Sequence, residues 1–187
     1  MDETQYCLCC DEDVPINTVY RDGKKEITCL YCGFVLGFQE EKKGASASCI
    51  LTADDSNLIR NLLTDILTNK RLAEDVLSFE NGMTFLAEFN QRIIRPDGVS
   101  LVILDLQMPV MDGLKTALTL RAVETKLQRD KKTPIIFFSA RKCDEALKKQ
   151  LARCAPAVYF NKGDSPDPAN LADRVDRLVN YILTRKK

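Results

Sequence analysis

Four groups of polar residues in this sequence stand directly after runs of apolar residues. In chain order they are the pair Asp54 and Asp55, then Asp105, then Ser139, then Lys162. Strands buried on both faces read as continuous apolar runs, and the reactive groups of open α/β sheets lie beyond the carboxyl ends of such strands. Because these ends face the same side of a parallel sheet, we expect three carboxylates, a hydroxyl and an ammonium to converge in one shallow pocket.

The charges of this predicted pocket favour a bound cation. Three neighbouring carboxylates repel one another, and Lys162 alone cannot neutralise them. Mg2+ prefers oxygen ligands and keeps coordination positions open for water and phosphate. The pocket therefore suits phosphoryl transfer onto a carboxylate, in which metal and lysine stabilise the equatorial oxygens during in-line attack.

The order of these motifs carries a resemblance. Residues 47–187 are similar to the receiver domain of bacterial response regulators, because they contain an acidic pair, the pattern D-x-x-M-P-x-M-D-G, a hydroxyl residue before alanine, and a lysine, each after an apolar run. The roles that the resemblance implies are phospho-acceptor for Asp105, Mg2+ binding for Asp54, Asp55, Asp105 and the backbone carbonyl of Gln107, phosphoryl binding for Ser139 and Lys162, and switching for Ser139 and the aromatic Tyr159.

Two features depart from the pattern of that family. The family usually follows its lysine with proline, whereas this chain has Gly163, so the residue that would stiffen the lysine loop is missing while the charge is retained. The hydroxyl and the lysine are also one residue further apart than expected, which predicts a longer loop before Pro156. A degenerate receiver that no longer accepts phosphate is the alternative interpretation.

The N-terminal residues contain a second motif that could bind a metal. Cys7 and Cys10 form one C-x-x-C pair, and Cys29 and Cys32 form another after eighteen intervening residues. Two such turns complete a tetrahedral Zn2+ site with four thiolates, which is structural because no coordination position stays open. Cys9 is an alternative ligand, although the Cys7 and Cys10 pair gives the better geometry.

The segment around these cysteines reads as a zinc ribbon. A β-hairpin is predicted from residues 16–20 and 26–28 around an Asp-Gly turn, and residues 34–38 are predicted to add a third strand. Residues 39–47 have the charged and small side chains of a flexible linker. We therefore expect a zinc ribbon and linker over residues 1–44 and a receiver domain over residues 47–187.

Charge distribution predicts what the ribbon contacts. Residues 1–44 carry nine acidic and five basic side chains, whereas the remainder carries eighteen acidic and twenty-two basic ones. An acidic ribbon lacks the positive surface that phosphate binding requires, so nucleic acid is not expected. Either a protein partner or the more basic receiver of the same chain is expected to contact it.

Five strand–helix alternations are predicted after the linker, with strands near residues 48–53, 75–79, 99–105, 134–139 and 157–161 and a last helix from about 168 to 185. The right-handed crossover rule then predicts a doubly wound, five-stranded parallel sheet of the flavodoxin-like receiver type. Together with the ribbon, this makes an α/β protein with a small N-terminal β domain.

Composition agrees with an intracellular signalling protein. The 187 residues have 45% hydrophobic content and eight cysteines, and no apolar run approaches the length of a membrane span. The first residues do not resemble a signal peptide, so a cytoplasmic bacterial protein without membrane insertion is expected.

The sequence therefore predicts a stand-alone response regulator of a two-component phosphorelay. A sensor histidine kinase would supply the phosphoryl group, and the output would be contact with a downstream protein or a phosphorylation-dependent dimer. Two alternatives are a zinc-ribbon adaptor with an inactive receiver and a small Mg2+-dependent phosphatase. The phosphatase would need a general acid two residues after Asp105, where the chain has Gln107.

Overall fold

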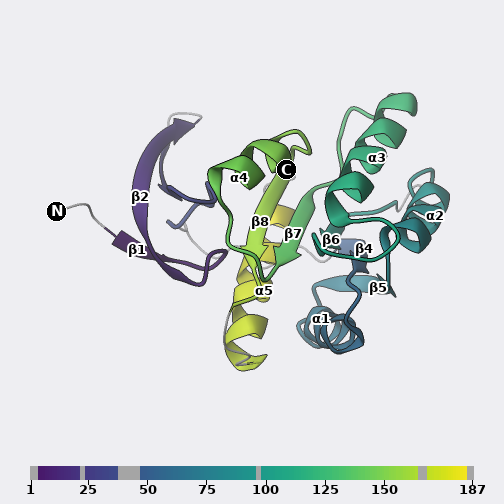
Figure 1. The fold of residues 1–187 in the computed structure, drawn as a ribbon, viewed down its shortest axis with the longest axis horizontal. Helices are drawn as coiled ribbons and strands as arrows, with labels where there is room; N and C mark the ends of the chain where they lie inside the picture. The colour runs from purple at the N-terminus through teal and green to yellow at the C-terminus, as the bar shows by residue number, and fades with distance from the viewer. Residues whose placement is uncertain (1–3, 22–23, 38–46, 96–97, 164–167, 185–187) are drawn as a thin grey trace.

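The computed structural model describes residues 4–21, 24–37, 47–95, 98–163 and 168–184, which form two sheets and five helices (Figure 1). The larger sheet is parallel and contains β4 (Ala47–Ala53), β5 (Ala73–Phe79), β6 (Leu101–Leu104), β7 (Ile135–Ser139) and β8 (Ala157–Asn161). All five predicted strands are therefore confirmed, with small differences at their ends. The strand order is β5-β4-β6-β7-β8, which is the flavodoxin-like order.

Helices cover both faces of this sheet. The helices α1 (Asn57–Asn69) and α5 (Pro168–Thr184) share one hydrophobic cluster with the sheet. The helices α2 (Gly82–Arg92), α3 (Gly113–Lys126) and α4 (Glu145–Ala152) share a second cluster on the opposite face. Along β7, Ile136 and Phe138 belong to the first cluster and Ile135 and Phe137 to the second, because successive strand residues point to opposite faces.

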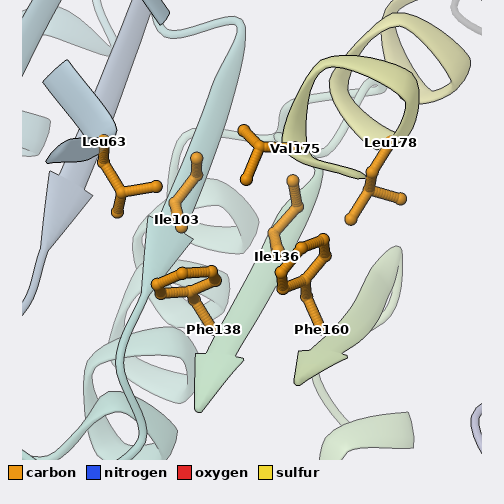
Figure 2. A pocket seen from close by; sticks show the side chains of 7 residues that line it. All are labelled: Leu63, Ile103, Ile136, Phe138, Phe160, Val175 and Leu178. Carbon is orange, nitrogen blue, oxygen red and sulfur yellow. The ribbon is translucent and has the colours of Figure 1, made fainter. Parts of the chain in front are cut away.

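A small apolar pocket lies between the sheet, α1 and α5 (Figure 2). Its lining is hydrophobic throughout and comprises Leu63, Ile103, Ile136, Phe138, Phe160, Val175 and Leu178. With no polar group to orient a ligand, the pocket is a packing gap in the first core cluster and not a binding site.

The strand order reverses between β4 and β6, which places a crevice at their carboxyl ends. Ala53 pairs with Leu104, so the next residues, Asp54 and Asp105, lie on neighbouring strands. The helix α3 begins next to the Asp105 backbone. Asp112 is the N-cap of this helix, and the Asp112 Oδ1 accepts from the Lys115 N–H at 2.8 Å. The sheet thus delivers its polar residues to one edge.

The smaller sheet is antiparallel, with strand order β1-β2-β3, and contains β1 (Thr4–Cys7), β2 (Glu12–Arg21) and β3 (Lys24–Cys29). Together, residues 4–21 and 24–37 are called the N-terminal module below. The predicted hairpin is confirmed, but the prediction of a strand over residues 34–38 is wrong. Within the described residues 34–37, Val35 makes only an isolated bridge to Thr28, and the third strand is β1.

Residues 34–36 turn back beside β3 but pair with it over a single bridge. The Phe34 carbonyl accepts from the Cys29 N–H, and the Leu36 N–H donates to the Ile27 carbonyl, both at 2.7 Å. The Phe34 ring packs against the receiver, where its centroid lies 5.2 Å from that of Tyr181 of α5 in an edge-to-face arrangement. The predicted Asp22-Gly23 turn and most of the linker at 39–47 lie outside the described residues.

None of the helices in the described part of the chain is long and apolar enough to cross a membrane.

Gly113 is the residue at which α3 approaches the acidic edge most closely. A Cβ at this position would overlap the backbone carbonyl oxygen of Asp105, so no other residue fits without displacing β6 or α3. We predict that Gly113→Ala lowers the free energy of unfolding by about 1–3 kcal/mol, as overpacking in a core does. Urea unfolding measures this change. Gly37→Ala is the matched control, since its Cβ would make only ordinary contact; equal effects of the two substitutions would contradict the argument.

Candidate functional site

Three carboxylates meet at the carboxyl edge of the parallel sheet. Asp54, Asp55 and Asp105 each place a carboxylate oxygen within 4.8 Å of the others. Asp54 and Asp105 are buried at 1% and 5% exposure, whereas Asp55 is exposed. The cluster therefore has two buried charges and one side open to solvent, as a partly hydrated cation requires.

Lys162 supplies the positive charge of this cluster. Its Nζ lies 2.6 Å from the Asp54 carboxylate and 3.2 Å from that of Asp105. The ammonium also lies 5.3 Å from the ring centroid of Phe138, in cation–π geometry. Because one lysine faces three carboxylates, the cluster retains net negative charge and favours a cation.

The acidic loop is held in shape by its own helix. The Asp54 carboxylate accepts from the Ser56 N–H at 3.0 Å, and Arg60 Nη1 donates to the backbone carbonyls of Asp54 and Asp55 at 2.9 and 3.0 Å. Sequence reasoning missed Arg60. The available signal was a long basic side chain one turn into the helix that follows the acidic pair.

Burial affects the acid strength of Asp105. Desolvation raises the pKa of its carboxyl group, and the neighbouring Asp54 adds to this effect, while the ammonium of Lys162 opposes it. The Gln107 backbone N–H donates to the same carboxylate, whereas the Gln107 side chain is exposed. Burial thus makes the ionised form of Asp105 less favourable than it would be in water.

Ser139 and Tyr159 lie at the same end of the sheet. Ser139 is buried, its Oγ accepts from the Arg141 N–H at 3.3 Å, and its carbonyl accepts from the Lys162 N–H at 2.8 Å. Tyr159 pairs with Phe137 in the sheet and is 3% exposed, so its ring lies inside the molecule. Desolvation raises the pKa of the Tyr159 hydroxyl above its usual range.

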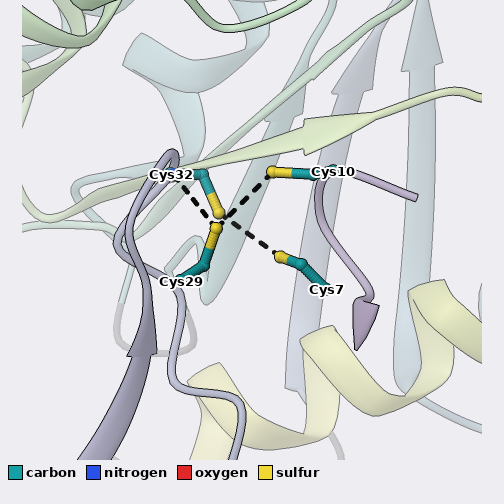
Figure 3. A group of neighbouring side chains, drawn as sticks. All are labelled: Cys7, Cys10, Cys29 and Cys32. Atoms are coloured by element: carbon teal, nitrogen blue, oxygen red, sulfur yellow. Dashed lines mark hydrogen bonds between the residues drawn. The ribbon is translucent and has the colours of Figure 1, made fainter. Parts of the chain in front are cut away.

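Four cysteines of the N-terminal module converge, as Figure 3 shows. The Sγ atoms of Cys7 and Cys32 are 3.6 Å apart, and those of Cys10 and Cys29 are 3.7 Å apart. A tetrahedral site with Zn–S bonds of about 2.3 Å has sulfur atoms about 3.8 Å apart, so the cluster fits Zn2+. The four Sγ atoms all lie within 4.8 Å of one another, and these four cysteines are the predicted ligands.

The thiols of this cluster already perturb one another. Hydrogen bonding from Cys10 lowers the pKa of the Cys7 thiol, and hydrogen bonding to Cys29 raises the pKa of the Cys10 thiol. The Cys32 N–H also donates to Cys29 Sγ at 3.3 Å, which favours a thiolate there. Cys9 is buried beside the group but is not one of the four that converge.

Comparison with known proteins identifies the larger domain. Residues 50–167 match the family model of the response regulator receiver domain. This chain belongs to that family. The receiver is similar to the cyanobacterial phytochrome response regulator RcpA in its phosphorylated form, with a TM-score of 0.60, 20% identity, and coverage of 75% of this chain and 96% of that one.

A second solved structure has the same fold. The receiver domain of the histidine kinase CKI1 from Arabidopsis thaliana, complexed with Mg2+ and BeF3-, has a TM-score of 0.57 and 20% identity over 73% of this chain and 91% of that one. Structural neighbours of this receiver therefore bind Mg2+. At these identities the similarity establishes the fold alone.

Curated relatives carry the name protein-glutamate methylesterase/protein-glutamine glutaminase. The Nocardioides protein is 38% identical over 48% of this chain and 22% of its own length, and the Clostridium acetobutylicum protein is 30% identical over 71% and 35%. The chain thus spans about a third or less of the length of these two relatives.

The pKa of Asp105 leads to a prediction about stability. A carboxyl group whose pKa is raised in the folded state favours folding below its unfolded pKa, and this contribution is lost as pH rises through the folded pKa. Asp105→Asn should therefore raise the free energy of unfolding by about 0.5–2 kcal/mol near neutral pH without Mg2+. The difference should shrink as pH falls towards about 4.

Urea unfolding of both proteins across this pH range, without metal, measures the difference. If the acidic cluster binds Mg2+ in the folded state only, Mg2+ should stabilise the native protein more than the Asp105→Asn variant. A difference that is independent of pH would show that burial of the Asp105 charge is not its cause.

Proposed function

We propose that this chain is a response regulator of a two-component phosphorelay, which accepts a phosphoryl group on Asp105 and signals through contact with another protein. The observation that carries the proposal is the bridge from Lys162 Nζ to the carboxylates of Asp54 and Asp105 at the sheet edge. A sensor histidine kinase is the proposed donor, since receivers accept phosphate from such kinases. The downstream protein is left open.

The proposed chemistry starts at the Asp105 carboxylate. One of its oxygens attacks the phosphorus of the donor in line, the bond from phosphorus to the donor breaks, and an acyl phosphate forms on Asp105. Lys162, already 3.2 Å from this carboxylate, would pair with the new phosphoryl oxygens. The Ser139 hydroxyl would donate to the same group.

Mg2+ is proposed as the cation of the acidic cluster. Asp54, Asp55 and Asp105 would hold it together with the backbone carbonyl of Gln107. A bound Mg2+ would neutralise the charge that develops on the phosphoryl oxygens. The exposure of Asp55 supports this proposal, because water can reach the open side of the cluster.

Ser139 and Tyr159 are proposed to report the phosphorylated state. If the Ser139 hydroxyl turns towards the phosphoryl group, the end of β7 is redirected, and Tyr159 lies on the neighbouring strand β8. The Tyr159 hydroxyl already accepts from Asn161 Nδ2 at 3.3 Å. The switch would thus reach the outer strand of the sheet.

Zn2+ is proposed to hold the N-terminal module together through Cys7, Cys10, Cys29 and Cys32. The sulfur spacing supports this proposal, and four thiolates leave no position for catalysis. We also propose that the module and the receiver are separate domains, at residues 1–44 and 47–187.

A regulatory role is favoured over an esterase role for this chain. The methylesterase relatives extend well beyond the matched region, and this sequence contains no histidine, so a Ser-His-Asp triad cannot be assembled from it. An adaptor with an inactive receiver is the second candidate, supported by Gly163 in place of the family's proline.

Phosphorylation is tested by intact mass. We predict that incubation with Mg2+ and acetyl phosphate adds one phosphoryl group to the native protein and none to Asp105→Asn. The exposed Asp130 provides the matched control, and Asp130→Asn should behave like the native protein. Equal labelling of native protein and Asp105→Asn would place the acceptor elsewhere, and no labelling with no Mg2+ binding would favour the adaptor.

Zinc is tested by metal analysis of the purified protein. We predict about one zinc ion per chain, since four thiolates close one tetrahedral site. Cys29→Ser should lose this zinc, whereas Cys143→Ser should retain it, because Cys143 is outside the cluster. Retention of zinc by Cys29→Ser would exclude the proposed ligand set.

A further inference from the structure

The N-terminal module contacts the receiver at the end of β8, one residue before Lys162. The backbone N–H of Asn161 donates to the carbonyl of Cys9, which lies between the predicted zinc ligands Cys7 and Cys10. This hydrogen bond directly joins two sites that are far apart in sequence. In Figure 1 the module lies beside β8, α4 and α5.

Arg174 of α5 strengthens this contact. Its side chain is buried, and its guanidinium donates to the Leu8 carbonyl at 2.6 Å and to the Asn161 carbonyl at 2.8 Å. It also pairs with Asp11 at 3.1 Å and lies 4.5 Å from the ring centroid of Phe160. One cation thus binds both the cysteine turn and the residue before the lysine.

The Asn161 side chain forms hydrogen bonds with residues before and after Lys162. Its Oδ1 accepts from the Gly163 N–H at 2.7 Å, and its Nδ2 donates to the Tyr159 hydroxyl at 3.3 Å. The Lys162 N–H itself donates to Ser139. The backbone that carries the lysine is therefore restrained on each side, and its ammonium is already positioned at Asp54 and Asp105.

Gly163 explains why proline is missing after the lysine. Its φ is +84°, which proline cannot adopt because its ring holds φ near −65°. A Cβ at Gly163 would also overlap the carboxylate of Asp11, so the module occupies the space that a side chain would need. Contact with the module thus replaces proline as the restraint on the lysine loop.

We propose that the metal state of the four-cysteine site sets the affinity of the Asp105 site for a phosphoryl group. This inference rests on the proposed function. With metal bound, the turn that carries Cys9 is fixed, and Asn161 and Lys162 are positioned in advance. Without metal this restraint weakens, so phosphoryl binding must order the lysine loop itself. Cys9, Asn161 and Arg174 act as positioning residues, and zinc loading raises phosphoryl affinity.

The test uses the full chain with and without zinc, and Mg2+ with beryllofluoride as the phosphoryl probe. Calorimetric titration gives the probe Kd, and fluorine NMR reports the bound probe. We expect zinc removal to weaken binding by about five- to tenfold. By linkage, the probe must raise zinc affinity, measured by equilibrium competition with a chelator, by the same factor.

Asp11→Asn provides a variant that keeps zinc and fold but weakens the contact. Asparagine tolerates the left-handed backbone of this position, where φ is 62°. It removes the charge that pairs with Arg174 and keeps an amide oxygen that can accept from the Tyr6 hydroxyl. The zinc effect on probe Kd should fall at least twofold in this variant. The exposed Asp13 is the matched control, and Asp13→Asn should keep the full effect.

The outcomes separate this proposal from the proposed function. Failure of zinc or of the probe to bind the native protein overturns the proposed function, and this inference with it. If both bind, and the probe Kd values of the zinc-loaded and zinc-free chains agree within twofold, only the coupling is overturned. Tighter probe binding after zinc removal overturns the coupling as well. Circular dichroism of the zinc-free chain checks that the receiver helices persist, and if they do not, the Asp11→Asn comparison decides.

Discussion

The constraint on which this structure depends is the clustering of three carboxylates at one sheet edge, where a single ammonium pairs with two of them. Asp54 and Asp105 are buried with Lys162 between them, and burial raises the pKa of Asp105. This arrangement of charges is unfavourable by itself. It persists because the sheet, the acidic loop before α1 and the lysine loop fix the positions of the three side chains. The proposed binding of a cation and then of a phosphoryl group would gain from this unfavourable starting state.

The supports of the acidic site differ in how they work. On the acidic side, Arg60 and Ser56 hold the loop by local hydrogen bonds within six residues of sequence. On the lysine side, the support comes from other parts of the chain. The Cys9 carbonyl accepts from the Asn161 N–H, and Arg174 of α5 donates to the carbonyls of Leu8 and Asn161. The N-terminal module thus supports the receiver's lysine loop, in addition to bringing its four cysteines together.

Charge complementarity adds to the apolar packing that joins the module to the receiver. Asp11 and Glu12 of the module face Arg174 and Lys142, and the Leu30 carbonyl accepts from Lys148 of α4. Of these contacts, the buried Arg174 pair contributes most, because the exposed Lys142 pair is screened by solvent. The acidic module therefore contacts the more basic receiver of the same chain, which is one of the two partners that the charge distribution had left open.

The sequence by itself determined the five parallel strands, the acidic and lysine positions, and the cysteine pairs, because apolar runs and ligand spacing are local signals. It did not determine Arg174, an arginine on the apolar stripe of α5, or the third strand of the module, which is β1 and not residues 34–38. The role of Gly163 depended on Asp11, which lies beside it only in the folded chain. Long-range contacts decide such features, since a buried charge or a left-handed glycine has meaning only beside its partner.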